Sequence, residues 1–202
     1  MSSSLRFHRE QEAVRIELAS PDGLPRLSAS LLEQLDAELA RLLADPTCHG
    51  IVIHGSEKCF AAGAEIAEVA ALGGVTALAF ARRGQFLFDR LAGAGKPAVA
   101  AVSGYCLGGG FDLALASQWR VATPDAIFGH PGPTLGLLTG WGGTQRLAAL
   151  IGQGRALELL LASDPVPADR ALALGLVDEL VPQEQLLPRA LKRARQLAHT
   201  QT

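Results

Sequence analysis

Two glycine-centred turns in this sequence have the composition of a backbone anion site. They cover residues 59–66 (CFAAGAEI) and 103–112 (SGYCLGGGFD), and each follows a short apolar run. Small residues let a ligand approach the main chain closely, and free N–H groups at a helix start favour negative charge. Two such turns side by side would supply two converging donors, which stabilise the oxyanion that forms when a carbonyl is enolised or attacked.

Each turn also has a purely structural interpretation. Three glycines at 108–110 permit tight packing of a helix on a sheet without any ligand. They do not fit the GxGxxG pattern of dinucleotide sites, and the chain has no GxxxxGK[ST] phosphate loop. Asp112 follows the triplet, where a carboxylate can act as a base or simply complement the helix dipole. The sequence therefore lacks the fingerprint of a dinucleotide-binding enzyme. Two interpretations of the turns, as an oxyanion site or as a purely structural pair, both remain open.

Strand and helix patterns alternate around these turns. Residues 13–18 alternate with period two, and leucines from 31 to 43 recur at helical spacing behind a serine N-cap. Short apolar runs at 49–55 and 97–102 predict buried strands, and helical patterns follow both. A further strand is predicted at 119–122. Further helices are predicted near 143–150, 155–161, 168–174 and 183–198. This order indicates an α/β fold with a largely parallel sheet.

Composition narrows the class of protein. The 202 residues are 49% hydrophobic and 19% charged, with a net charge of -2, which is typical of a globular domain and offers no footprint for nucleic acid. We expect a single domain over residues 1–202. No signal peptide or membrane-length apolar run is visible.

The cysteines and histidines indicate no metal. Cys48, Cys59 and Cys106 show no CxxC spacing, and the histidines have no metal-ligand spacing. We therefore expect no metal, reduced thiols and a cytoplasmic location without membrane or nucleic-acid partners.

Taken together, several segments resemble the crotonase (enoyl-CoA hydratase/isomerase) family in order and spacing. The matching stretches are 60–66, 96–104, 108–110, 128–131, 142–147 and 171–177. The resemblance implies a spiral of ββα repeats that binds an acyl-CoA thioester in fatty acid metabolism, as a lyase or isomerase. It implies no cofactor other than the coenzyme A of the substrate. It also implies a homo-oligomer, a trimer or hexamer.

Roles in the site follow from the resemblance position by position. The two oxyanion-hole amides fall on Ala64 and Gly109, and Asp112 falls on an acid/base position. Substrate-binding positions fall on Ala62, Glu65, Ile66, Gly108, Gly132 and Trp141. The family usually has Asp where this chain has Glu65.

The acid/base positions depart from the family pattern. A hydratase of this family uses two glutamates; here the first position is Asp112, and the second, 20 positions later, is Gly132. Loss of one carboxylate removes acid/base catalysis on the order of 10²–10⁴-fold unless another group substitutes. Nearby candidates are His130, Thr134, Thr139 and Trp141. His130 is more readily interpreted as pointing into the structure or a subunit contact, and Trp141 as core.

Two hypotheses of function follow. The first is an enzyme that acts on an acyl-CoA through a stabilised enolate; isomerisation, decarboxylation or thioester hydrolysis fits one carboxylate better than two-glutamate hydration does. The second is a catalytically inactive CoA-binding or assembly protein. Family members usually continue past the last predicted helix, so the resemblance also implies a domain without the usual C-terminal helical extension.

Overall fold

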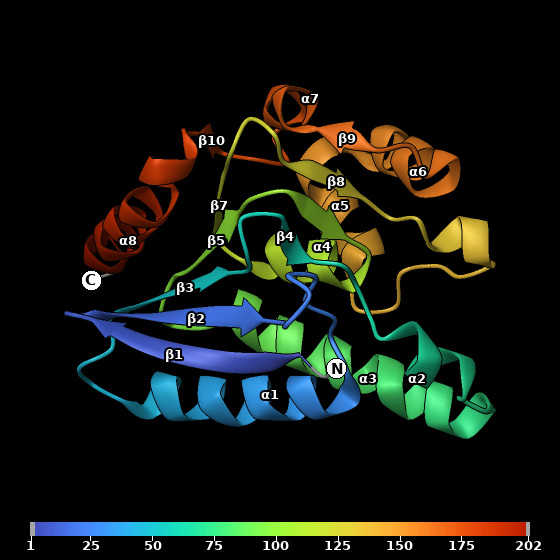
Figure 1. Cartoon of the computed structure of the whole chain (residues 1–202), viewed down its shortest axis with the longest axis horizontal. Helices are drawn as coiled ribbons and strands as arrows, with labels where there is room; N and C mark the ends of the chain where they lie inside the picture. Colours follow the sequence, from blue (N-terminus) through green and yellow to red (C-terminus); the bar gives the residue numbers. More distant parts are fainter. Residues whose placement is uncertain (1–2, 201–202) are drawn as a thin grey trace.

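A large, mostly parallel sheet forms one side of the fold in a computed structural model that describes residues 3–200. Its strand order is β1-β2-β3-β5-β7-β10 (Figure 1). Only the β1–β2 pair is antiparallel. The strands are β1 (Ser4–Glu10), β2 (Ala13–Ala19), β3 (Gly50–His54), β5 (Ala98–Val102), β7 (Trp119–Ala122) and β10 (Glu179–Leu180).

A smaller sheet runs beside the first, in the order β4-β6-β8-β9. Its strands are β4 (Cys59–Ala61), β6 (Tyr105–Leu107), β8 (Ile127–Gly129) and β9 (Val166–Pro167). Three consecutive pairs, β3–β4, β5–β6 and β7–β8, each place one strand in the large sheet and the next in the small sheet, and helical segments follow each pair. This is the expected spiral of ββα repeats, so the α/β fold class is confirmed.

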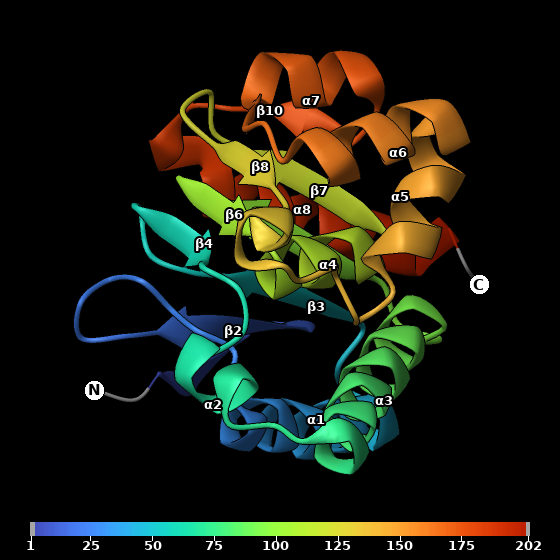
Figure 2. The same cartoon turned by 90° about the vertical axis from the view of Figure 1, so that its right-hand side faces the viewer.

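Helices enclose the two sheets. They are α1 (Ala29–Ala44), α2 (Ile66–Ala70), α3 (Gly74–Ala92), α4 (Gly109–Ala116), the 3-10 helix η1 (Gly132–Leu135), α5 (Gly143–Ile151), α6 (Gln153–Ala162), α7 (Ala168–Leu174) and α8 (Gln183–Thr200). Helix α8 packs on one face of the large sheet, and α4 lies between the sheets and the other helices (Figures 1 and 2). No helix within residues 3–200 has the length and apolar character needed to cross a membrane.

Burial explains the strand sequences. Strands β3 and β5 are buried along their whole length, which is why their sequences are continuously apolar rather than alternating. One face of the large sheet packs against α8, for example where Val99 of β5 and Ala190 of α8 share a cluster. The other face joins the main core, which includes Leu35 of α1 and Phe88 of α3. The core therefore fixes the strand ends from which the glycine turns depart.

The link between β5 and β6 depends on one glycine. Gly104 has φ +59°, and a Cβ there would overlap the carbonyl of Lys58. The adjoining chain is tied down, because Tyr105 N donates to Lys58 O at 3.1 Å and Ile127 N donates to Gly104 O at 2.9 Å. The step from the large sheet to the small sheet thus requires a residue without a side chain.

Substitution of Gly104 by Ala is expected to lower the free energy of unfolding by more than about 2 kcal/mol, because it adds both backbone strain and overlap. Gly154→Ala in α6 is the matched control: no atom lies within 4 Å of its added Cβ, so alanine should stabilise the helix by up to about 1 kcal/mol. Urea unfolding of the two variants measures both changes. Equal effects of the two substitutions would contradict this account.

Candidate active site

The first turn leaves one backbone amide free. After β4 the chain passes through Gly63, at φ +104°, into α2. Leu27 N donates to Gly63 O at 2.8 Å, and Glu65 N donates to Leu27 O at 3.4 Å. These two hydrogen bonds form a parallel β-bridge between Leu27 and Ala64. The N–H of Ala64 itself donates to no acceptor within residues 3–200.

The second turn leaves another free amide beside the first. Gly108, at φ +52°, donates its N–H to Gly129 O at 2.9 Å, and Gly109 opens α4, where an N–H has no partner within the helix. A Cβ on Gly63 would lie 3.3 Å from Leu107 O and 3.6 Å from Gly109 N. The backbones of the two turns are therefore in contact, and the convergence of their two donors on one ligand stays a prediction.

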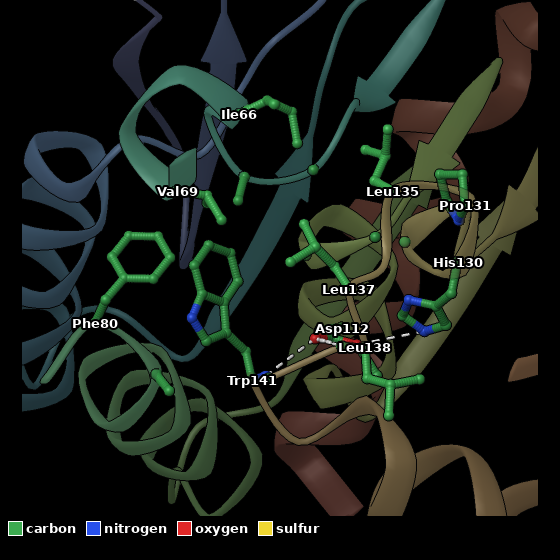
Figure 3. A pocket seen from close by; sticks show the side chains of 18 of the residues that line it. Ile66, Val69, Phe80, Asp112, His130, Pro131, Leu135, Leu137, Leu138 and Trp141 are labelled. Atoms are coloured by element: carbon green, nitrogen blue, oxygen red, sulfur yellow. Dashed lines mark hydrogen bonds and ion pairs between the residues drawn. The ribbon is translucent and has the colours of Figure 1, made fainter. Parts of the chain in front are cut away.

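These turns form one wall of a pocket of about 250 Å³. The opposite walls come from α2, α3 and the segment 130–141 (Figure 3). Most lining side chains are apolar, including Ile66, Val69, Phe80 and Leu137. The pocket therefore suits an apolar group whose polar end reaches the free amides.

Trp141 is both core and pocket wall. The residue is 4% exposed, and its ring packs on Phe80 and Phe88 at centroid distances of 5.2 and 5.7 Å. A Cβ on Gly84 or on Gly109 would overlap the indole. The ring therefore fits only because glycines stand on both α3 and α4, and it holds the start of α4 against the pocket.

Asp112 is buried beneath this wall with one oxygen anchored. Its side chain is 1% exposed, and Oδ2 accepts hydrogen bonds from the Thr139 hydroxyl and, at 3.3 Å, from Trp141 N. A Cβ on Gly143 would overlap Oδ1, so the glycine makes room for the carboxyl. Burial raises the pKa of Asp112 from 3.8 to about 6, although the hydrogen bonds from Thr139 and Trp141 and the charge of Arg146 oppose the rise.

His130 faces the other carboxyl oxygen. Its ring stacks on Phe111 at 5.0 Å between centroids, and Nε2 lies 3.4 Å from Asp112 Oδ1. Within residues 3–200, the two ring nitrogens of His130 and the Oδ1 atom of Asp112 have no hydrogen-bond partner. Burial lowers the pKa of His130 to about 4, so at neutral pH the ring is uncharged while Asp112 is ionised, and the contact is not an ion pair.

Gly132 stands where the sequence led us to expect a second acid/base position, and it carries no functional group. Gly132 begins η1 on the pocket wall, and a Cβ there would lie 2.7 Å from Leu137 O. A glutamate placed at this position would meet main chain, not free space. The Thr134 side chain hydrogen-bonds within its own loop, because its hydroxyl donates to Pro131 O at 2.7 Å.

The structure brings most of the sequence candidates together. The shared pocket is lined by Ala62, Ala64, Ile66, Gly108, Gly109, Asp112, Gly132 and Trp141. Glu65 lies outside the lining, at the N-cap of α2. Sequence reasoning did not identify Gly84 and Gly143, whose need for glycine comes from contacts distant in the chain. The sequence favoured an inward or interface position for His130. The residue is indeed buried, at 4% exposed, and its ring also lines the pocket.

Comparison with known proteins identifies the family. The enoyl-CoA hydratase/isomerase family model matches residues 8–202. The chain is 36% identical over 189 residues to the crotonyl-CoA hydratase of Syntrophomonas wolfei, covering 93% of this chain and 73% of that protein. It is 40% identical over 185 residues to a probable enoyl-CoA hydratase of Rhizobium meliloti, covering 91% and 70%.

A solved structure agrees with these relatives. The enoyl-CoA hydratase of Bacillus anthracis superposes with a TM-score of 0.89 at 32% identity, covering 98% of this chain and 77% of that one. The fold and these comparisons thus define a member of the crotonase superfamily. This chain belongs to the enoyl-CoA hydratase/isomerase family.

Burial of Asp112 gives the folded state a pH-dependent stability. Because the folded pKa lies above the unfolded value of 3.8, the contribution is fully present below about pH 4 and is lost as the pH rises through about 6, a change of about 3 kcal/mol. Asp112→Asn should therefore be more stable than the parent at pH 8, with the difference shrinking below pH 4. Urea unfolding across this range, with exposed Asp125→Asn as control, measures it. A pH-independent difference would contradict the assignment.

Proposed function

We propose that this protein binds an acyl-CoA thioester and forms its enolate, with the thioester oxygen at the amides of Ala64 and Gly109. The observation that carries the proposal is the pair of free backbone donors on adjoining turns, facing an apolar pocket. Such fixed donors stabilise charge that develops on a carbonyl oxygen, and exclusion of water strengthens them. The proposal needs no cofactor beyond the coenzyme A of the substrate.

The walls suit the acyl group. Side chains of α2, α3 and the 130–141 segment leave an apolar space next to the donors, where a hydrocarbon chain is removed from water. The proposed coenzyme A contacts follow the family pattern, through Ala62, Glu65 and Ile66 at the exit of the first turn and through Gly108 at the second. Trp141 and Gly132 then border the acyl chain.

Asp112 is the proposed proton-transfer group. It lies one helical turn after Gly109 in α4, so its carboxyl and the second amide share one rigid element. Anchoring of Oδ2 by Thr139 and Trp141 leaves Oδ1 for the substrate. Above about pH 6 the carboxylate can take the C2 proton while the electron pair moves to the thioester oxygen. If the substrate is a 3-enoyl-CoA, the enolate is conjugated with its C3–C4 double bond. The carbonyl then re-forms, a C2–C3 double bond forms, and the C3–C4 π electrons take the proton back from Asp112 at C4, which completes an isomerisation.

The names of relatives favour hydration within the same family. The proteins of Syntrophomonas wolfei and Rhizobium meliloti are named as hydratases, and hydration passes through the same enolate. Gly132 favours a second candidate function, that of an inactive CoA-binding protein, since it offers no second carboxyl. Enolate formation is the step that separates an enzyme from a binder.

Exchange of the C2 protons of butyryl-CoA in D₂O tests the proposal directly. The protein should catalyse deuterium incorporation detected by mass spectrometry, and Asp112→Asn should lower the rate by about 10²–10⁴-fold. Asp125→Asn serves as the control. Failure to bind butyryl-CoA in calorimetry would contradict the whole proposal; binding without exchange would leave an inactive CoA-binding protein.

A further inference from the structure

Three buried polar atoms at the pocket wall lack partners within residues 3–200. They are Asp112 Oδ1 and the two ring nitrogens of His130. Buried polar atoms are nearly always hydrogen-bonded, because burial without a partner is costly. Two of the three, Oδ1 and Nε2, face each other at 3.4 Å, and both side chains line the pocket (Figure 3).

Packing alone does not account for a histidine here. The ring is 4% exposed and stacks on Phe111, a contact that a phenylalanine would make without orphaned nitrogens. Asp112 Oδ2 already has two donors, so the carboxyl does not need the ring to stay in place. The unused hydrogen-bonding capacity therefore belongs to something that enters the pocket.

We propose that Asp112 Oδ1 and His130 Nε2 together hold one water molecule that adds to C3 of an enoyl-CoA, with His130 as a positioning residue. This inference rests on the proposed function, since it uses the same carboxyl and the same amides. An oxygen on the pocket side of the two atoms, within hydrogen-bond distance of both, would accept from Nε2–H and donate to Oδ1. The β-hydroxyl of the hydrated product would occupy the same place.

The proposed reaction balances with a single carboxylate. The water oxygen bonds to C3 and its proton passes to Asp112 Oδ1, while the C2–C3 π electrons shift to C1–C2 and the carbonyl pair moves onto the thioester oxygen. The carbonyl then re-forms and C2 takes the proton from Asp112. One water is added, Asp112 returns to its ionised form, and His130 stays neutral throughout, in keeping with its lowered pKa.

An exposed segment lines the pocket beside this pair. Each orphaned atom has little access to solvent, and residues of the loop 132–138 contribute to the lining of the same pocket. None of the residues of η1 is buried, and Leu138 is 68% exposed. Segments with so few buried contacts open at low free-energy cost, so an entering acyl group and water can displace the loop.

Comparison of two reactions of this protein separates the role of His130 from the role of Asp112 and the two amides. Hydration of crotonyl-CoA requires the positioned water, whereas C2 exchange of butyryl-CoA requires only the amides and Asp112. His130→Phe should lower hydration about 10²-fold more than it lowers exchange, because misplacement of a reactant costs about that factor. His130→Gln, which keeps an N–H donor, should retain more hydration than His130→Phe. His49→Phe, at an exposed position, is the matched control.

The other possible results of these experiments contradict either the inference about His130 or the proposed function. Equal losses of hydration and exchange in His130→Phe would assign the ring a structural role, and unchanged hydration would assign it none; both overturn the inference. If the parent protein exchanges C2 protons but does not hydrate crotonyl-CoA, the inference fails while the proposed function stands. If it does neither, the proposed function fails as well.

Discussion

The contact between two main-chain turns is the constraint on which the site depends. Gly63 and the 107–109 turn meet without intervening side chains, and a Cβ at Gly63 would lie 3.3 Å from Leu107 O. This approach places two unpaired N–H groups on one wall. The parallel pairing of β4 and β6 brings the turns together, and the glycine at 104 lets the chain step into that sheet. The ligand chemistry thus follows from backbone geometry, and side chains adjust it.

Much of this was predictable from the sequence, for physical reasons. Buried strands such as β3 and β5 carry continuous apolar runs, and α1 carries leucines at helical spacing with Ser28 accepting from Leu31 N at 3.2 Å. The short strands β4, β6 and β8 were not predicted as strands. Three residues are too few for periodicity to register, and their pairing partners come from other turns of the spiral.

The same limit applies within the site. Ala64, Gly109 and Asp112 were assigned through the family resemblance, and they lie on local turns and a helix start that the sequence makes visible. The contact of His130 with Asp112 and the requirements for Gly84 and Gly143 depend on contacts between α3, α4 and the segment 130–143. Such contacts leave no local pattern, since a glycine needed for an indole on a distant segment looks like any other helical glycine.

The closure of the loop over Gly132 also bears on how this sequence can change with time. With Leu137 O 2.7 Å from the place of a Cβ, any side chain at 132 must be accompanied by a new path for the main chain that follows. Installation of a second carboxylate at 132 therefore requires a change in the loop as well as in this residue. Position 132 and the loop are epistatically coupled, so the effect of a side chain at 132 depends on the sequence of the residues that follow it.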